Sequence, residues 1–290
     1  MKVLPRGQGL AMANIITSAQ NPLVKSLVSL RKKKRLRFQK GVFLIEGERE
    51  LLHALAGGIE FETMVFCREL LVGNAELNSM ESLAGRFSIG STGAVELVEV
   101  SPRAYGKIAL RENTEGIVGV AKIPRRDIHK LQLSKNPLVL VVAGVEKPGN
   151  LGALLRTADG AGVEVLIVCG GEVDLYNPNV VRSSLGALFT VPTFPLSWEE
   201  TGQWLQENRI RMIFTSPAVE KDYTKEDYTG AVAIFLGSEK EGLPSEWLRK
   251  KNSKVKIPMR GQMDSLNTSC SGAIVLYEAV RQRERKRGQA

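Results

Sequence analysis

Histidine and cysteine are scarce in this 290-residue chain, which contains two histidines and three cysteines. Cys67, Cys169 and Cys270 lie far apart in the sequence and form no ligand pair. With only His53 and His129 to add, the chain supplies neither the ligand set of a zinc site nor the paired cysteines of a disulfide framework. We therefore expect no metal, and a cytoplasmic protein whose thiols stay reduced.

Long apolar runs are also missing. No apolar stretch approaches the roughly 20 residues that a bilayer-spanning helix needs, and the N-terminal residues lack the apolar segment of a secretory signal. The apolar run at residues 138–145 has the length of a buried strand. The sequence therefore predicts a globular protein without a membrane partner.

Acidic residues are absent from the first forty positions, which contain ten Lys and Arg. This segment carries a charge of +10 and the whole chain +9, so residues 41–290 sum to about −1. Concentrated charge of this kind is typical of binding to RNA phosphates, although a solvated helix face or a disordered arm has the same composition. Leucines and Phe38 interleave with the charges, which favours a segment anchored to folded structure and not to a membrane surface. The candidate RNA-binding residues are Arg31, Lys32, Lys33, Lys34, Arg35 and Arg37.

The pattern of strands and helices predicts two domains. Residues 14–122 form a small α/β module, and residues 123–137 are polar, bounded by prolines and expected to be a linker. From 138 to 287, short apolar strands alternate with helices, which predicts a parallel sheet covered on both faces. In such sheets, ligands bind beyond the carboxyl ends of the strands.

The loop at residues 144–152 is the first of three polar loops expected at strand ends. Gly144 and Gly149 have the spacing of a phosphate-binding P-loop, but the Lys and Ser or Thr that should follow Gly149 are absent. The chain also has no G-x-G-x-x-G motif. The sequence therefore disfavours nucleoside triphosphates and nicotinamide cofactors as ligands. Asn150 and Arg156 remain as polar candidates for the site.

The second loop spans residues 236–244. Gly237 and Gly242 allow the backbone to turn sharply and to present N–H and C=O groups to a flat ligand, and Glu239 lies inside the turn. The third loop, residues 257–267, leads into the last helix. The four- and three-residue spacing of apolar side chains in that helix predicts a buried face formed by Leu266, Cys270, Ala273, Tyr277 and Val280.

Taken together, the three loops resemble the three motifs of the SpoU (TrmH-type) branch of the SPOUT RNA 2′-O-ribose methyltransferases. Their order and spacing match jointly, and the likeness covers residues 138–285. Residues 180–188 are similar to a helix of the family, and residues 14–122 more loosely resemble the L30e-like RNA-binding domain that often precedes it. The matching segments are Asn150 with Arg156-Thr-Ala-Asp-Gly160, Leu236-Gly-Ser-Glu239 with Gly242-Leu-Pro244, and Ile257-Pro258 with Ser265-Leu-Asn267.

The resemblance implies a parallel-sheet domain with a deep trefoil knot, a homodimer, and S-adenosylmethionine as cofactor. Apolar walls with backbone donors and acceptors suit the adenine ring of that cofactor. The implied cofactor contacts, largely through backbone atoms, are Thr215, Gly237, Ile257 and Leu266.

The implied reaction is methyl transfer to a ribose 2′-hydroxyl. Arg156 would activate this hydroxyl, either as a base or by clamping the hydroxyl and its neighbouring phosphate; a pKa above about 12 makes the clamp physically easier. By the same resemblance, Asn150 would orient Arg156 and the RNA, and Glu239 would hold the arginine or polar groups of the pocket. Ser265 and Asn267 would complete the active site.

Several functions compete at this stage. The N-terminal domain favours 23S ribosomal RNA as substrate by analogy, and transfer RNA is the alternative. A non-enzymatic RNA-binding factor on the same fold is disfavoured by the intact motif residues. The basic segment disfavours a protein substrate, and the missing P-loop lysine disfavours nucleotide hydrolysis.

Overall fold

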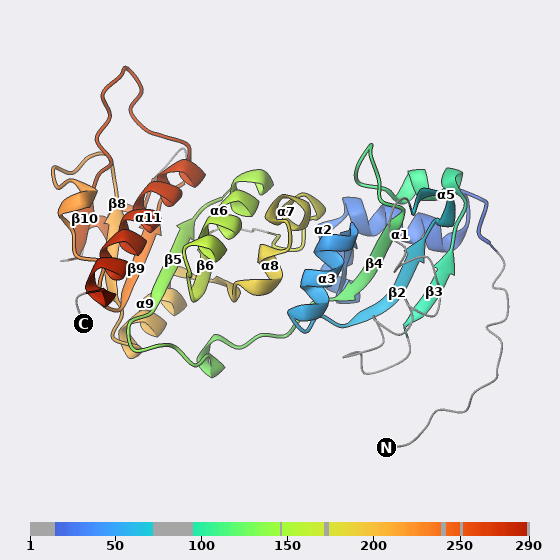
Figure 1. The fold of residues 1–290 in the computed structure, drawn as a ribbon, viewed down its shortest axis with the longest axis horizontal. Coiled ribbons are helices and arrows are strands. Elements are labelled where there is room, and N and C mark those ends of the chain that lie inside the picture. The colour runs from blue at the N-terminus through green and yellow to red at the C-terminus, as the bar shows by residue number, and fades with distance from the viewer. Residues whose placement is uncertain are drawn as a thin grey trace. The chain divides into compact units, whose positions relative to one another are not determined.

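The computed structural model describes residues 15–71, 95–145, 147–170, 174–238, 242–249 and 252–288. Its N-terminal and C-terminal parts form two compact units, whose main boundary lies between Ile123 and Pro124; Leu52–Gly57 group with the second unit. Both are α/β, as the sequence predicted (Figure 1). In the part of the chain that is described, no helix is both long and apolar enough to cross a bilayer.

The N-terminal unit is built on a mixed four-stranded sheet of order β1-β4-β2-β3. β4 pairs antiparallel with β1 and β2, and β2 pairs parallel with β3. Residues 15–123 contain, in chain order, α1 (Pro22–Lys32), α2 (Lys34–Lys40), β1 (Val42–Glu46), α3 (Glu48–Ala56), β2 (Phe61–Phe66), the 3-10 turn η1 (Arg68–Leu70), β3 (Glu96–Glu99), α5 (Pro102–Ile108) and β4 (Ile117–Lys122). Residues 72–94 of the predicted module lie outside the described residues.

The basic segment forms two helices separated by one residue. The Asn21 side chain caps α1 by accepting a hydrogen bond from the Leu23 amide at 2.8 Å. The backbone of Lys33 is extended, with φ −112° and ψ 105°, and this breaks the helix between α1 and α2. Gly41, with φ 67°, then ends α2 in the left-handed conformation that glycine tolerates best.

The C-terminal unit is built on a six-stranded sheet of order β10-β8-β9-β5-β6-β7, in which every pairing is parallel. Helices cover both faces. Its elements are η2 (Ile128–Lys130), β5 (Leu138–Ala143), α6 (Pro148–Gly160), β6 (Val165–Cys169), α7 (Pro178–Ser184), α8 (Ala187–Thr190), β7 (Thr193–Leu196), α9 (Trp198–Glu207), β8 (Arg211–Thr215), η3 (Tyr223–Lys225), β9 (Val232–Leu236), α10 (Ser245–Arg249), β10 (Ser253–Val255) and α11 (Thr268–Arg287).

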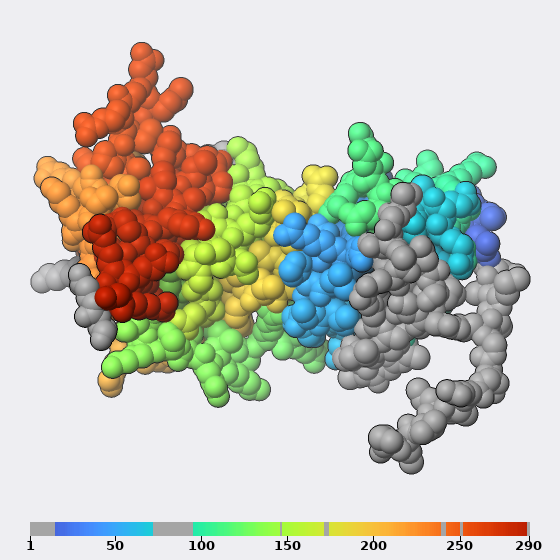
Figure 2. Space-filling view, in the orientation of Figure 1, coloured from blue at the N-terminus to red at the C-terminus, as the bar shows by residue number. Residues whose placement is uncertain are grey.

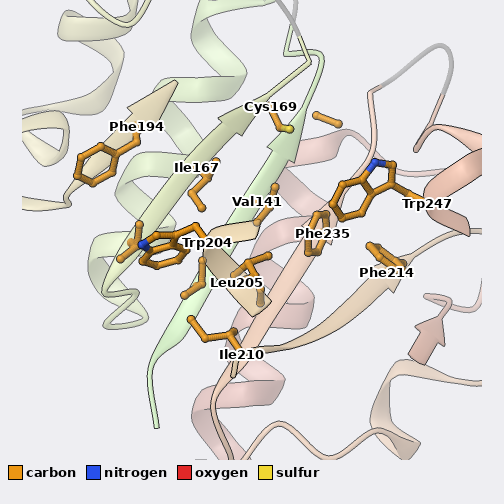
Figure 3. Close-up of a cluster of buried hydrophobic side chains, with 14 of the residues drawn as sticks. Val141, Ile167, Cys169, Phe194, Trp204, Leu205, Ile210, Phe214, Phe235 and Trp247 are labelled. Carbon is orange, nitrogen blue, oxygen red and sulfur yellow. The ribbon is translucent and has the colours of Figure 1, made fainter. Parts of the chain in front are cut away.

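One face of this sheet packs against aromatic side chains. Trp204 of α9 and Trp247 of α10 are buried in a cluster with Phe214 and Phe235 from β8 and β9 (Figure 3). The Phe214 and Phe235 rings meet edge to face with centroids 4.7 Å apart, a favourable aromatic geometry. Helices α6 and α11 cover the opposite face, where Gly272 of α11 lies against side chains of α6 and β9.

The sequence patterns missed part of the region between β6 and β8. Residues 180–188, which resemble a single helix of the family, belong to two helices, because Leu185 and Gly186 have positive φ angles of 50° and 95°. Strand β7 was not predicted; it is a four-residue edge strand that contains Pro195, and such strands give a weak signal. Helix α9, also missed, begins with a capping box formed by Ser197 and Glu200.

The expected linker is more structured than its composition suggests. Ile128 is 5% exposed and belongs to the core of the C-terminal unit. The Ser134 amide and hydroxyl donate hydrogen bonds of 2.8 and 2.6 Å to the Glu164 carboxylate. These contacts attach the segment to the sheet that follows it.

Candidate active site

A pocket lies beyond the carboxyl ends of β8, β9 and β10, at the sheet edge where a parallel sheet is expected to bind its ligand. Its volume is about 110 Å³. Three stretches of chain enclose it, one following each of these strands. The lining residues are Thr215, Ser216, Pro217, Leu236, Gly237, Ser238, Gly242, Ile257, Met259, Asp264, Ser265, Leu266, Thr268 and Ser271.

Glycine at position 237 is required by the turn that forms one wall of the pocket. Ser238 and Gly242 pair across this turn, with N···O distances of 3.0 and 3.2 Å. A Cβ atom on Gly237 would stand 2.5 Å from the carbonyl carbon of Gly242. Any side chain there would therefore push the two arms of the turn apart.

The first loop touches the second. A Cβ atom on Gly144, whose φ is 52°, would lie 3.0 Å from the Ser238 Cβ. Gly144 follows β5 and Ser238 follows β9, and these two strands are neighbours in the sheet. The loops after β5 and β9 therefore meet at the pocket edge, as the sequence predicted for parallel strands.

The first and third loops are joined by an amide pair. Asn267 Nδ2 donates to Asn150 Oδ1 over 3.3 Å. Asn267 also caps α11: its Oδ1 accepts from the Ser269 amide at 2.9 Å and from the Ser269 hydroxyl at 2.5 Å. With Oδ1 occupied by two donors, Nδ2 is the atom turned to Asn150.

Arg156 is exposed on α6, fewer than two helical turns after Asn150. Within the described part of the chain, no group hydrogen-bonds or ion-pairs with its guanidinium. Helix α6 packs so closely on α7 that a Cβ atom on Gly152 would clash with the Ser183 hydroxyl oxygen. Arg156 is thus an available cation on a rigidly packed helix.

The structure places the predicted site residues as follows. All four predicted cofactor contacts, Thr215, Gly237, Ile257 and Leu266, line the pocket, and so does Ser265. Glu239 lies outside the described residues. Sequence reasoning missed Asp264, Met259 and Ser271; the spacing of Ser271, one helical turn after Asn267, was the available signal.

Away from the pocket, one buried carboxylate links three segments of the C-terminal unit. Glu226 is 5% exposed and binds Arg211, Lys221 and Ser253, which belong to β8, to the segment after it and to β10. Burial alone would raise the pKa of this carboxyl, but the hydrogen bonds from Lys221, Ser253 and Arg211 outweigh it and lower the pKa to about 2. Arg211 and Ser253 begin their strands, so this network sits at the sheet edge opposite the pocket.

Comparison with known proteins agrees with this geometry. Residues 137–277 match the SpoU rRNA Methylase family, and residues 21–119 match the MRM3-like substrate binding domain. An uncharacterized tRNA/rRNA methyltransferase of Synechocystis, slr1673, is 33% identical over 92% of this chain and 93% of its own length. The chain belongs to the SpoU rRNA methylase family.

Further relatives extend the likeness to nearly the whole SpoU chain. The 23S rRNA (uridine(2479)-2′-O)-methyltransferase of Streptomyces viridochromogenes is 29% identical, with 96% of each chain covered. A crystal structure of an RNA 2′-O ribose methyltransferase has 39% identity and a TM-score of 0.78, covering 93% of this chain and 99% of that one. An AdoMet-bound rRNA methyltransferase from Sinorhizobium meliloti has 28% identity and a TM-score of 0.81, covering 92% and 97%.

The predicted family, α/β fold, enzyme class and cofactor are thereby confirmed. This SpoU methylase is an S-adenosylmethionine-dependent RNA 2′-O-methyltransferase.

The predicted buried face of the last helix is wrong. Leu266 is 38% and Tyr277 53% exposed, and Cys270 is also exposed. The residues that α11 buries are instead Thr268, Gly272, Val275, Leu276, Glu278 and Ala279. The buried side differs from the predicted one because Gly272 allows α11 to approach α6 and β9 closely. Glu278 can be buried because its carboxylate accepts hydrogen bonds from Arg281 and Gln282.

The basic segment of this SpoU methylase also needs one correction. Arg37 is only 2% exposed, and its Nη1 donates to the carbonyl oxygens of Leu30 and Arg31 at the end of α1, at 2.5 and 3.1 Å. Arg31 is half-buried and donates to the Ala109 carbonyl after α5. Arg37 therefore caps a helix inside the unit and is removed from the candidate RNA surface, because water and RNA do not reach it.

Proposed function

We propose that this methyltransferase modifies a ribose 2′-hydroxyl of 23S ribosomal RNA. The observation that carries the proposal is the convergence of three loops on one pocket edge, with Asn150 bonded to Asn267 beside it. Relatives named as 23S rRNA 2′-O-methyltransferases support the choice of RNA; one acts on a uridine and another, 34% identical and from Vibrio cholerae, on a guanosine.

The pocket residues suit the cofactor chemically. Leu236, Ile257 and Leu266 supply apolar surface, and Gly237 leaves its backbone open to hydrogen bonding. The Thr215 hydroxyl donates to the Phe235 carbonyl at 2.8 Å, so Thr215 contributes shape more than a free donor. When bound there, S-adenosylmethionine supplies an electrophilic methyl group on a positively charged sulfur.

Arg156 has the properties of a clamp for the substrate. An arginine guanidinium stays protonated at any working pH, so it donates protons in hydrogen bonds and does not remove them. Its planar fork can hold a phosphate oxygen and the 2′-hydroxyl together, which orients the hydroxyl oxygen and stabilises charge that develops on it. Asn150 would orient Arg156 and the RNA, and the family resemblance gives Glu239 the role of holding the arginine or polar groups of the pocket.

Ser265 and Asn267 complete the proposed site from the loop that precedes α11. This loop projects from the surface of the C-terminal unit (Figure 2), and its Met263 side chain is 75% exposed. The Asn267 cap ties the end of the loop to α11 and, through Asn150, to α6. Asn150 and Asn267 thus stand at the N-terminal ends of two helices that pack against each other.

We further propose that two copies of the chain pair through the exposed apolar stripe of Leu266, Cys270, Ala273 and Tyr277. These residues recur at helical spacing, yet the chain itself leaves Leu266, Cys270 and Tyr277 exposed. A continuous apolar stripe is usually covered in the functional protein. A second copy presents the same stripe, and self-complementary contact of this kind is how twofold dimers form.

The test uses S-adenosylmethionine with a labelled methyl group and two RNAs transcribed without modification, 23S rRNA and a transfer RNA pool. We expect label in 23S rRNA at one 2′-O-methylated nucleotide, and its loss in Arg156→Ala. Arg249→Ala, an exposed arginine on α10, is the matched control and should retain activity.

Other outcomes would replace the proposal. Label confined to transfer RNA would move the substrate to that class. Measurable cofactor binding without label in either RNA would contradict 23S rRNA as a sufficient substrate. Absence of both label and cofactor binding would leave an RNA-binding protein on this fold.

A further inference from the structure

Phe38 lies on the outer surface of α2 with 49% of its area exposed. Its neighbours in sequence face the other way: Arg37 is buried, and Leu36 packs against the core of the N-terminal unit. The helix is therefore seated with Arg37 inward and Phe38 outward. The sequence pattern had suggested that this ring anchors the basic segment, but the anchoring is done by Arg37 and Leu36.

The surroundings of the Phe38 ring are cationic. Lys34 and Arg35 precede it by four and three residues and so share its side of the helix. Lys32, Lys33 and Arg35 are exposed. Residues 15–41 contain eight Lys and Arg and no acidic residue, so no carboxylate of this segment neutralises them.

The ring is held on a rigid support. Arg37 closes the junction between α1 and α2 through its bonds to the Leu30 and Arg31 carbonyls. Lys40 Nζ donates to the Ser26 hydroxyl at 3.1 Å, which ties the end of α2 back to α1. A surface fixed in this way loses little conformational entropy when it binds a ligand.

An exposed aromatic ring among cations matches the chemistry of an unpaired nucleotide. Bases of single-stranded loops and bulges stack on aromatic side chains, while their phosphates are held by Lys and Arg. An apolar protein partner fits less well, because covering the ring would also remove the neighbouring cations from water. Bases in a duplex are already stacked on one another and offer no free face.

We propose that Phe38 stacks on the base of an unpaired nucleotide in the RNA substrate, and that Lys32, Lys33 and Arg35 hold the flanking phosphates. This inference rests on the proposed function, since it gives the N-terminal unit a feature of the RNA to read. The N-terminal unit would then select an RNA that offers an unpaired loop or bulge to α2.

The experiment compares wild type with Phe38→Ala, Phe38→Leu and Phe38→Trp. Binding of a fluorescein-labelled single-stranded RNA and of the same strand in a duplex is measured by anisotropy, and kcat and KM are measured on unmodified 23S rRNA. Removing a stacked aromatic weakens binding by roughly 5- to 100-fold. We expect this loss for the Ala and Leu variants on single-stranded RNA, with a matching rise of KM, an unchanged kcat and duplex binding within about twofold.

The Phe38→Trp variant should restore binding, and the fluorescence of the indole it introduces should be quenched when RNA is added, as expected for an indole stacked on a base. Melting temperature and cofactor binding control for folding. Wild-type affinity in the Leu variant would show a simple apolar contact and overturn the proposal. Assembled ribosomal particles are tested in parallel; if the Phe38 variants lose affinity for these particles alone, the ring contacts a ribosomal protein and the proposal is overturned.

The two proposals fail in different ways. If wild type methylates neither 23S rRNA nor transfer RNA, the proposed function fails. If wild type methylates 23S rRNA and Phe38→Ala does so with an unchanged KM, only the stacking inference fails.

Discussion

The amide nitrogen of Asn267 lies 3.3 Å from the amide oxygen of Asn150, and this bond joins residues 117 positions apart in the chain. Asn150 lies in the first turn of α6, the helix that also carries Arg156, and Asn267 is the N-cap of α11. The bond therefore connects α6 to the end of the loop that lines the pocket. One side chain therefore holds the helix end and the proposed catalytic helix in a common register.

Asn267→Ser separates these two roles. Serine is about as good a helix cap as asparagine, but it is too short to keep the bond to Asn150. We expect the free energy of unfolding to change by less than about 0.5 kcal/mol, while kcat falls by roughly tenfold or more through loss of alignment. Chemical denaturation and single-turnover methylation measure the two effects. A normal kcat in a stable variant would show that the amide pair has no part in the reaction.

Gly237→Ala should weaken cofactor binding. Its Cβ would meet the Gly242 backbone at 2.5 Å, and backbone has no alternative rotamer to adopt. We expect the Kd for S-adenosylmethionine to rise at least tenfold in calorimetry. Gly149→Ala is the control, because no atom lies within 4 Å of the added Cβ; it should leave the Kd unchanged. Equal affinity in both variants would mean that the turn at Gly237 does not shape the cofactor site.

Acid should weaken the C-terminal unit through Glu226. Folding lowers the pKa of this carboxyl from 4.5 to about 2, so its charged form stabilises the fold at pH values above about 5, and that stabilisation is lost as the pH falls from about 5 towards 2. Glu226→Gln removes the charge at every pH. We expect it to cost roughly 1–3 kcal/mol at pH 7 and to make the melting temperature fall less steeply below pH 5 than in wild type. Parallel curves for the two proteins would contradict this assignment.

Tyr277→Glu places a charge in the exposed apolar stripe of α11. If two copies pair through this stripe, burying an unpaired carboxylate is costly, and we expect monomers in light scattering at concentrations where wild type is dimeric. Ile15→Glu is the matched control, since Ile15 and Tyr277 are 52% and 53% exposed. A dimeric Tyr277→Glu protein would place the interface elsewhere.

Sequence patterns predicted the parallel sheet and its loops because short apolar strands and strand-end glycines are local features. They also brought Asn150, Ser265 and Asn267 to one sheet edge, since the carboxyl ends of parallel strands share an edge. Periodicity identified the apolar stripe of α11 but gave no sign of what covers it, so Tyr277 was wrongly predicted to be buried in the chain's own core. Arg37 was misplaced for a similar reason: only tertiary structure shows that its charge meets the carbonyls of Leu30 and Arg31. The helix break at Lys33 could not be predicted, because no glycine or proline marks it in the sequence.

Helix α11 follows every strand that the structure describes, so the pocket is completed only after both sheets have been synthesised. Every strand that the structure describes is complete by Val255, whereas one face of the C-terminal sheet is covered only once α11 has followed. A chain that stopped before Thr268 would keep the N-terminal unit and its basic surface, but it would lack the helix that Asn267 caps and the pocket wall at Ser271. Such a fragment could still occupy RNA without modifying it, so incomplete synthesis or clipping near residue 268 would produce a competitor of the enzyme and not merely an inactive copy.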